Sequence, residues 1–212
     1  MNVTDVSKKY LWIELILLFV IIPLLLALPA FIELKIFSVI IGFVYVLFAL
    51  YEYTKFKIKK PQKKLITFFW KSIIFRLIPI IIFGLIFIKF ISPESFFRLV
   101  IEDTRLWIVI IFFYSLGSVL PQEIIYRNFF FQRYHSLILN RKLFIIINAF
   151  LFAISHSFLN SWIVIAVTFL GGLMFALTYE KTRSTILVTI EHSLYGLVLF
   201  TIGIGPLLAF PS

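Results

Sequence analysis

Long apolar runs alternate with short polar stretches along the whole chain. Seven of these runs approach the roughly 20 apolar residues that an α-helix needs to cross a bilayer. The pattern therefore predicts an all-α, polytopic helical membrane protein. We place its spans at residues 10–31, 36–53, 65–91, 106–123, 143–158, 162–179 and 185–204.

The third run is longer than a span requires and contains Lys71, Arg76 and Pro79. We expect its first turns to lie at the membrane surface, where the long cationic side chains can snorkel to water. A split of this run at Pro79 would give eight spans instead of seven.

Basic residues between the spans indicate the orientation, because cytoplasmic loops are enriched in Lys and Arg. The loop after the second span holds six lysines: Lys55, Lys57, Lys59, Lys60, Lys63 and Lys64. A second basic group follows the fourth span: Arg127, Arg133, Arg141 and Lys142. These groups predict a cytoplasmic N-terminus and an external loop at Ser92–Arg105.

The composition supports a membrane protein and excludes several other classes. Of the 212 residues, 62% are hydrophobic and 14% are charged, whereas about a quarter are charged in a typical soluble domain. Cysteine is absent, which excludes disulfides, thiol catalysis and thiolate metal sites. The net charge of +10 is explained by basic loops, so no nucleic-acid partner is expected. We interpret the 27 Phe and four Trp as lipid-facing packing and interfacial anchors.

We expect a single membrane-embedded unit in which residues 1–105 form N-terminal helices and residues 106–204 carry the chemistry. Placing an ionisable side chain inside a span costs roughly 2.5–3.5 kcal/mol, so each such residue is expected to have a structural or functional role. The candidates are Glu14, Glu123, Arg127, His156, Glu191 and His192.

Helical spacing groups several of these candidates. Glu123 and Arg127 are four residues apart and lie on one helix face, so they can form an ion pair. Asn148, Phe152 and His156 repeat at the same interval in the fifth span.

The seventh span repeats the interval at His192 and Gly196, and the glycine is expected to leave open space beside the imidazole. Each feature also has a purely structural interpretation. Glu123 and Arg127 can be a buried clamp, an intramembrane histidine can be a packing residue, Glu14 can lie at the interface, and Glu191 can make a separate contact.

Three sequence runs carry a resemblance to a known family. They are PQEIIYRNFFFQR at 121–133, FAISH at 152–156 and EHSLYG at 191–196. In this order and spacing they resemble the motifs of the CPBP family, the CAAX prenyl proteases and bacteriocin-processing (Abi) proteins. The resemblance implies an intramembrane protease of a bacterial or archaeal plasma membrane that acts on a membrane-associated peptide or protein.

The family pattern is E-E-x-x-x-R, then F-x-x-x-H, then H-x-x-x-N or a variant. The resemblance implies that the first glutamate and the second motif's histidine activate a water, while the third motif's histidine and its partner stabilise the oxyanion. By position, these roles fall on Gln122, Glu123, Arg127, Phe152, His156, His192 and Gly196.

Two positions depart from the pattern. Gln122 replaces the first glutamate, and an amide is not a general base. Gly196 has no side chain that could polarise a carbonyl. Either Glu123 turns from Arg127 to act as base, or His156 does so while Gln122 orients the water. The departure at Gln122 would also fit an inactive family relative, or an introduced substitution that inactivates the site.

A zinc site is a further alternative, because His156, His192 and Glu123 could supply three ligands and leave one position open. The sequence has no H-E-x-x-H spacing, so we favour a metal-free glutamate and histidine site without a cofactor.

The sequence as a whole favours an intramembrane endopeptidase. Its main rival is a catalytically inactive relative that binds and regulates another membrane protein. A small transporter is disfavoured, since inverted repeats and paired broken helices are not apparent. CAAX, bacteriocin, signal-peptide and regulator processing all stay open as substrate classes.

Overall fold

A computed structural model describes residues 6–29, 31–54 and 63–205. Across these ranges the chain forms helices and no strand. Seven of the helical segments are long and apolar enough to cross a membrane, which confirms the all-α class and the seven predicted spans. Most of the lysine-rich loop, residues 55–62, lies outside the described residues.

The observed spans differ from the predicted ones mainly at their ends. They are Lys8–Ala27, Ile32–Glu52, Lys63–Ile91, Thr104–Arg133, Arg141–Leu159, Trp162–Thr182 and Thr185–Ile202. The third is one continuous helix, α4 (Lys63–Ile91), with Pro79 inside it. Residues 63–91, all of which the structure describes, are therefore not split at Pro79, and the alternative of eight spans is wrong. The fourth continues about ten residues beyond its predicted end and includes Arg127 and Arg133.

The fourth span contains two π-helical segments between α-helical ones. Its segments are α6 (Thr104–Phe112), η4 (Phe113–Val119), α7 (Leu120–Glu123), η5 (Ile124–Phe129) and α8 (Phe130–Arg133). Both η4 and η5 are π-helical, and such wide turns occur frequently at functional sites. The first sequence motif thus lies on and around a wide turn of the helix.

The chain divides into two compact units, each built from two separate stretches of sequence. The first unit comprises Met1–Lys59 and Gln122–Leu177, and the second comprises Lys60–Pro121 and Thr178–Ser212. We describe each unit by itself. The expectation of a single membrane-embedded unit stays a prediction.

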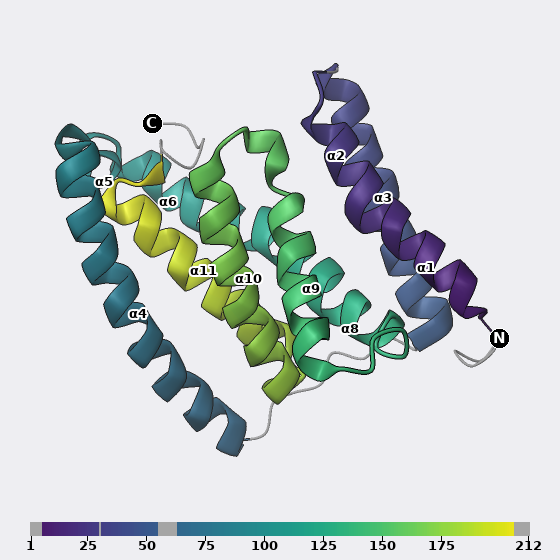
Figure 1. Cartoon of the computed structure of the whole chain (residues 1–212). Helices are drawn as coiled ribbons and strands as arrows, with labels where there is room; N and C mark the ends of the chain where they lie inside the picture. The colour runs from purple at the N-terminus through teal and green to yellow at the C-terminus, as the bar shows by residue number, and fades with distance from the viewer. Residues whose placement is uncertain (1–5, 30, 55–62, 206–212) are drawn as a thin grey trace. The chain divides into compact units, whose positions relative to one another are not determined.

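In the first unit, the N-terminal helices form a hairpin. The first span consists of α1 (Lys8–Ile16), π-helical η2 (Leu17–Ile21) and α2 (Ile22–Ala27), and it lies beside α3 (Ile32–Thr54) (Figure 1). Tyr10 and Tyr45 join the two helices, with their hydroxyl oxygens 3.2 Å apart.

A buried aromatic cluster connects this hairpin to the helix that carries the first motif. Phe19 of η2 is its centre, and ring centroids lie 5.2–6.4 Å from it. The surrounding rings are Tyr126, Phe129, Phe130 and Tyr134. All five side chains are buried, so the expectation that the aromatic residues face lipid is wrong for this group. Burial of aromatic rings stabilises the packing of the hairpin.

The second motif lies on α9 (Arg141–Ile154), which is followed by the short η6 (Ser157–Leu159) and by α10 (Trp162–Thr182). Asn140 caps α9 by accepting hydrogen bonds from two backbone N–H groups at 3.1 Å, as N-cap residues do. Gly172 of α10 lies so close to α9 that a Cβ there would be 3.1 Å from the Ala149 Cα. The absence of a side chain therefore permits close packing of these two helices.

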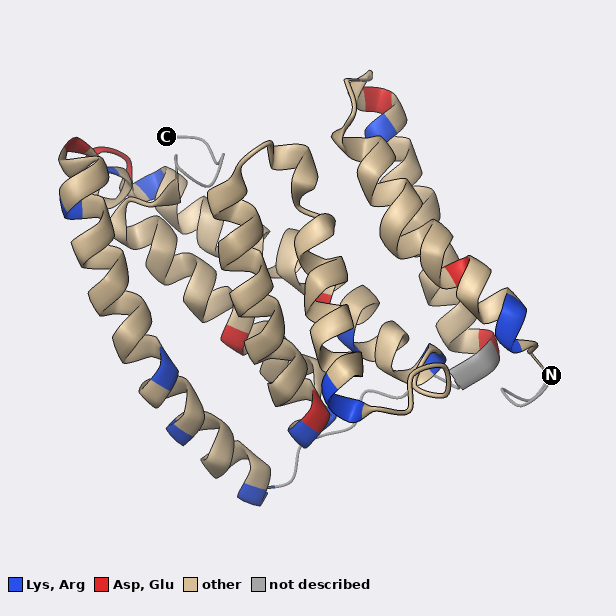
Figure 2. Cartoon of the chain, in the orientation of Figure 1, with Lys and Arg blue, Asp and Glu red and all other residues tan. Residues whose placement is uncertain are grey.

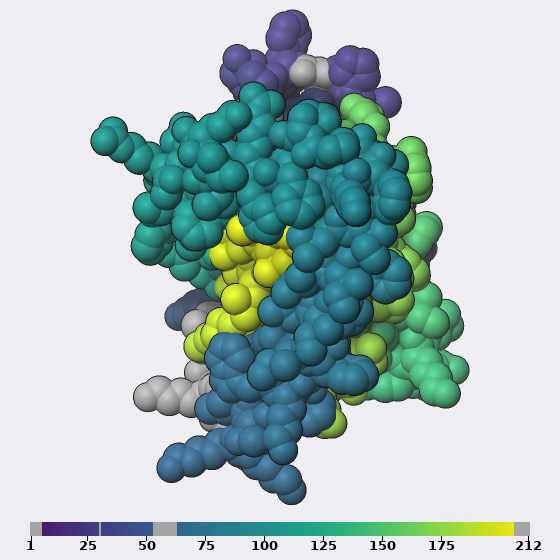
Figure 3. All heavy atoms as spheres, turned by 90° about the vertical axis from the view of Figure 1, so that its left-hand side faces the viewer, coloured from purple at the N-terminus to yellow at the C-terminus, as the bar shows by residue number. Residues whose placement is uncertain are grey.

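The second unit is built around α4 and α11 (Thr185–Ile202), which lie side by side (Figure 1). Figure 3 shows α11 in yellow, partly covered by α4 and by the segment after it. Trp107 Nε1 donates to Thr201 Oγ1 at 3.0 Å. Gly203 ends α11 with a φ of 110°, where a Cβ would be 1.9 Å from the Ser95 carbonyl oxygen. The left-handed conformation of this C-cap and the tight contact both require glycine.

Lysine and arginine gather near helix ends, most visibly at the N-terminal end of α4 (Figure 2). This distribution fits a helix whose middle lies in hydrocarbon, because charges are expensive there. The predicted orientation, with a cytoplasmic N-terminus, stays a prediction.

Candidate functional site

Glu123 and Arg127 of the first motif form an ion pair within one helix. Arg127 Nε lies 3.2 Å from Glu123 Oε2, and both side chains are fully buried. The spacing of four residues brings them together, as the sequence indicates. Because a buried charge without a partner is strongly destabilising, each residue requires the other.

Arg127 also connects the first motif to two further helices. Its guanidinium donates to Asn148 Oδ1 on α9 and to the Gly172 carbonyl oxygen on α10, the latter at 3.4 Å. The guanidinium carbon lies 4.9 Å from the ring centroid of Phe152 and 5.8 Å from that of Phe175. Cation–π contacts of this kind are strengthened by exclusion of water. Arg127 therefore fixes the positions of Glu123 and of the α9 face that leads to His156.

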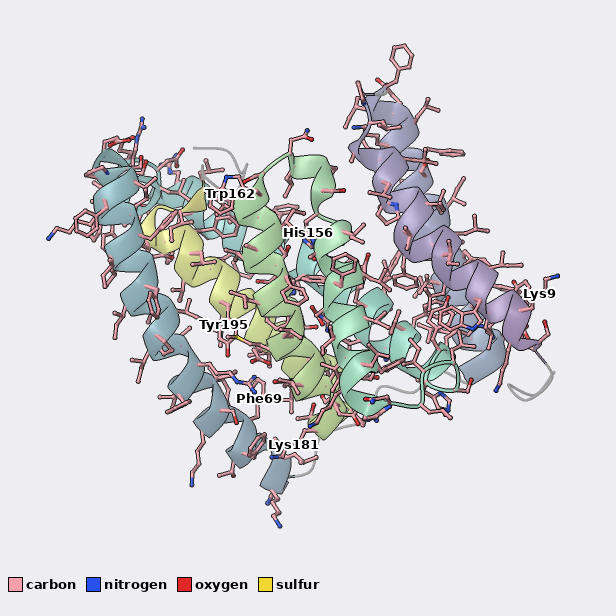
Figure 4. The ribbon with its side chains drawn as sticks, viewed as in Figure 1. Lys9, Phe69, His156, Trp162, Lys181 and Tyr195 are labelled. Atoms are coloured by element: carbon pink, nitrogen blue, oxygen red, sulfur yellow. The ribbon has the colours of Figure 1, made fainter. Side chains whose placement is uncertain are left out.

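His156 lies just beyond the C-terminal end of α9 (Figure 4). Its ring stacks edge-on against Phe152 with a centroid separation of 4.7 Å. Its Nδ1 lies 2.8 Å from the Phe152 carbonyl oxygen. Since a carbonyl oxygen can only accept, Nδ1 carries the hydrogen, and the lone pair of the neutral imidazole resides on Nε2. In the neutral imidazole, Nε2 is therefore the nitrogen with the chemistry of a base or a ligand.

The chain of contacts in the first unit runs from Glu123 through Arg127 and Phe152 to His156. Gln122 directly precedes Glu123 and is half-buried. Asn148, the remaining member of the α9 stripe, is fully buried and donates from Nδ2 to the Tyr126 carbonyl oxygen at 2.8 Å. The structure thus brings residues of the first two motifs into one connected group.

In the second unit, His192 is buried on α11, and Gly196 follows one turn later. The expected open space beside the imidazole is absent. A Cβ at Gly196 would lie 2.1 Å from the Tyr114 hydroxyl oxygen, so the side chain of Tyr114 occupies that space. The prediction of open space is wrong because a residue from η4, far from the motif in sequence, reaches into it.

Glu191, which precedes His192, makes the separate contact that the sequence analysis allowed for it. Its Oε1 accepts from Arg76 Nη1 at 2.7 Å and from the Tyr195 hydroxyl at 2.9 Å. Tyr195 lies on α11 on the side toward α4 (Figure 4). Arg76 also donates to Thr178 at 2.9 Å. Snorkelling of Arg76 is therefore wrong, because the guanidinium turns inward to a buried carboxylate.

Glu14 is buried as well, in contact with other polar side chains. Its carboxylate accepts from Arg133 at 2.9 and 3.1 Å, and from the Tyr45 hydroxyl. Arg133 is 1% exposed and lies in α8, so its assignment to the loop after the fourth span is wrong, while its cytoplasmic side stays a prediction. The cause is the extension of the fourth span, which carries Arg133 into the helical core of the first unit.

Residues 103–198, which are 96 of the 212, match the family model described as Rce1-like, type II CAAX prenyl endopeptidase. We refer to residues 103–198, which are similar to this family, as the Rce1-like domain. This match confirms the family resemblance and includes all three motifs. Neither a curated protein nor a solved structure matches the chain significantly.

Within either unit, the described part of the chain gathers no three His, Asp or Glu side chains as a metal-ligand set. The zinc alternative takes Glu123 and His156 from the first unit and His192 from the second. It stays a prediction for the Rce1-like domain, and a chelator tests it.

Sequence reasoning missed Tyr114, Arg76 and Arg133 as partners of the motif-bearing helices. None of the three is related to its partner by a helical interval. The one available signal was energetic, because Glu14 and Glu191 needed cations inside the membrane. That argument requires a partner but does not say which arginine supplies it.

Proposed function

We propose that this Rce1-like protein is an intramembrane endopeptidase in which His156 activates a water to hydrolyse a peptide bond of a membrane-associated peptide or protein. The observation that carries the assignment of the base is the hydrogen bond from His156 Nδ1 to the Phe152 carbonyl, because in the neutral imidazole it makes Nε2 the basic nitrogen. Glu123 is the less suitable base. Turning it toward water would break a fully buried ion pair with Arg127.

In the proposed reaction, Nε2 of His156 takes a proton from water as the water oxygen adds to the carbonyl carbon of the peptide. The electron pair of the C=O bond moves to the carbonyl oxygen, which becomes an oxyanion stabilised by His192. When the oxyanion collapses, the C–N bond breaks and the proton on His156 passes to the leaving nitrogen. The products are a carboxylate and an amine. Gln122 orients the water, since an amide can both donate to it and accept from it.

Arg127 and Glu123 are assigned a supporting role in this scheme. The contacts of Arg127 with Asn148 and Phe152 hold the face of α9 from which His156 extends. A well-placed base contributes about 10² to 10⁴ in rate, and that contribution depends on its position. The pair therefore affects catalysis through the placement of His156.

The second candidate is a regulatory scaffold without proteolytic activity. Gln122 in place of a carboxylate and Gly196 in place of a polar residue favour it. Such a protein would keep the helices of the Rce1-like domain and bind another membrane protein.

Proteolysis is tested with the purified chain in liposomes. The substrates are a farnesylated peptide ending in a CAAX sequence, its unprenylated counterpart and a panel of single-span peptides. We expect cleavage of at least one peptide, and we expect His156→Ala to abolish it while the protein stays folded. Gln122→Glu is informative in either direction: a gain of about 10²-fold or more would identify a missing carboxylate base, and a loss would identify the amide as the working group.

If neither the natural chain nor the Gln122→Glu variant cleaves any of these peptides, the regulatory scaffold is favoured. Inhibition by 1,10-phenanthroline, reversed by zinc, would instead assign His156, His192 and Glu123 as metal ligands.

The proposal also requires Glu123, His156 and His192 to act at one site, as the sequence predicts. Because the chain has no natural cysteine, His156→Cys and His192→Cys can be combined and tested for disulfide formation. We expect a crosslink in this pair. A 156–192 pair that fails to crosslink would argue against the shared site.

The orientation can be tested on the same background. We propose that the lysine-rich loop is cytoplasmic, so Lys60→Cys should be protected from an impermeant maleimide in intact cells, while Arg98→Cys should be labelled. The opposite result would reverse the orientation.

A further inference from the structure

Gly196 and Tyr114 are fitted to each other on the second unit. A Cβ built on Gly196 would lie 2.1 Å from the Tyr114 hydroxyl oxygen and 2.5 Å from its ring carbon Cζ. Both distances are far below van der Waals contact. The hydroxyl of Tyr114 therefore takes the place that the side chain of residue 196 would otherwise fill.

The ring of Tyr114 is held by two other residues of α11. It packs edge-on against Phe200 with a centroid separation of 4.9 Å and against His192 at 6.2 Å. His192, Gly196 and Phe200 are spaced four residues apart and share one helix face. Tyr114 lies across this face, with its hydroxyl at the glycine between the two rings.

Tyr114 comes from the π-helical segment η4 of the fourth span. A π-helical turn changes the direction in which the following and preceding side chains project, and such turns recur at functional sites. A phenylalanine at position 114 could pack against Phe200 and His192 equally well, so these ring contacts do not require the hydroxyl of Tyr114. Because Gly196 has no side chain, the hydroxyl of Tyr114 fits at this position, and the Tyr114 ring packs against the His192 imidazole.

We propose that the Tyr114 hydroxyl is a catalytic hydrogen-bond donor that acts with His192 to stabilise the oxyanion formed during peptide hydrolysis. The inference rests on the proposed protease function. A phenolic hydroxyl has one hydrogen to donate, and no covalent bond to Tyr114 forms or breaks. In this proposal, the absence of a side chain at Gly196 leaves room for the Tyr114 hydroxyl beside the third motif.

The first test removes only the hydroxyl. For the peptide that the natural chain cleaves fastest in the liposome panel, Tyr114→Phe should lower kcat by about 10² to 10³, as loss of an oxyanion donor does, with KM changed less than twofold. Tyr195→Phe is the matched control, because it removes a hydroxyl from α11 that binds Glu191. Its kcat should equal that of the natural chain, although its thermal stability should fall.

The second test moves the donor from one position to the other. In Tyr114→Leu/Gly196→Asn, the leucine lacks the ring atoms that would meet the new Cβ, and the asparagine amide supplies a donor from α11. We expect kcat within about tenfold of the natural value, whereas Tyr114→Leu alone should be as impaired as Tyr114→Phe. Gly196→Ala alone should lower the melting temperature, and Tyr114→Leu/Gly196→Ala should restore it.

The outcomes separate this inference from the proposed function. An active natural chain with an unimpaired Tyr114→Phe variant would overturn the role of Tyr114 and leave proteolysis intact. Equal impairment of Tyr114→Phe and Tyr195→Phe would also overturn it, because loss of any buried hydroxyl would then explain the effect. A natural chain that cleaves no peptide in the panel would overturn both. The melting temperatures of the Gly196 variants report on the fit of the two residues independently of activity.

Discussion

Both units contain arginine–glutamate pairs within the membrane spans, and two of these pairs, one from each unit, are built differently. In the first unit, Glu123 and Arg127 lie four residues apart on one helix, and both are fully buried. In the second unit, Arg76 and Glu191 are 115 residues apart and join α4 to α11, with the arginine side chain 24% exposed. The Glu123–Arg127 pair stabilises the conformation of the first motif within one helix, whereas the Arg76–Glu191 pair links two helices.

This difference shows what the N-terminal half contributes. Arg76 lies outside the matched residues 103–198, yet it binds the glutamate directly before His192. Glu14 is also outside the match and binds Arg133 of the first-motif helix. The N-terminal helices, which resemble the family only in their hydropathy, thus supply polar anchors for motif-bearing helices in both units. Such anchors permit the Rce1-like domain to keep charges in hydrocarbon.

The largest effect is expected for Arg127→Ala. The change leaves the Glu123 carboxylate buried and removes the contacts of the guanidinium with Asn148 and Phe152. Breaking a buried pair from one side costs about 3–5 kcal/mol, so the free energy of unfolding in detergent–lipid micelles should fall by this amount. Activity should fall as well, because the placement of His156 depends on Arg127.

Arg98→Ala is the matched control for this experiment. Arg98 and Glu102 have the same spacing of four residues, but both side chains are exposed. Exposed pairs contribute little, so unfolding should not change measurably. If Arg127→Ala were no more destabilising than Arg98→Ala, burial would not be the property that distinguishes the two pairs.

Arg133→Ala should have the next largest effect. It removes the cationic partner of the buried Glu14 carboxylate, which keeps the hydrogen bond from the Tyr45 hydroxyl. The expected loss is about 3 kcal/mol, the lower end of the range for a broken buried pair. A double-mutant cycle with Glu14→Gln measures the coupling. We expect a coupling free energy of about 1–3 kcal/mol, as for residues in direct contact, and a value near zero would mean that the N-terminal hairpin does not anchor the first-motif helix through this pair.

Arg76→Ala should be milder, at about 1.5–3 kcal/mol, as for loss of a hydrogen bond to a charged group. Tyr195 still donates to Glu191, and the Arg76 side chain is 24% exposed, so the pair is only partly buried. Lys71→Ala, an exposed cation earlier on α4, should leave unfolding unchanged. Equal effects of the two substitutions would restore the snorkelling interpretation for Arg76.

The sequence predicted those parts of the protein that depend on local intervals. Hydropathy gave seven helices, and the spacing of four predicted the contact of Glu123 with Arg127. Spacing along one helix did not predict contacts with residues of another helix, as for Glu14, Glu191 and Gly196. Such contacts depend on helix packing, which the chain determines through many weak side-chain interactions rather than through a repeat. The predicted end of the fourth span was wrong for a related reason: the ion pairs of Arg127 and Arg133 permit polar residues to continue a buried helix.

The smallest effect is expected at an exposed contact of the second unit, where the carboxylate is open to water. The Ser92 hydroxyl donates to Glu94, and this hydrogen bond lowers the pKa of that carboxyl below its ordinary value of 4.5. A carboxyl with a lowered pKa stabilises the fold above its ordinary pKa, and the contribution is lost as the pH falls through the pKa of the folded state. Ser92→Ala should raise the pKa of Glu94 toward 4.5, observed by carboxyl ¹³C NMR, and Ser92→Thr should keep it low. Because Glu94 is fully exposed, the pKa difference between the two variants should be small, and their difference in acid stability should be no larger than the equivalent of that pKa difference. A difference in acid stability as large as the loss expected for Arg127→Ala would mean that solvent-exposed contacts here matter as much as the buried pairs, and the contrast between the two classes would fail.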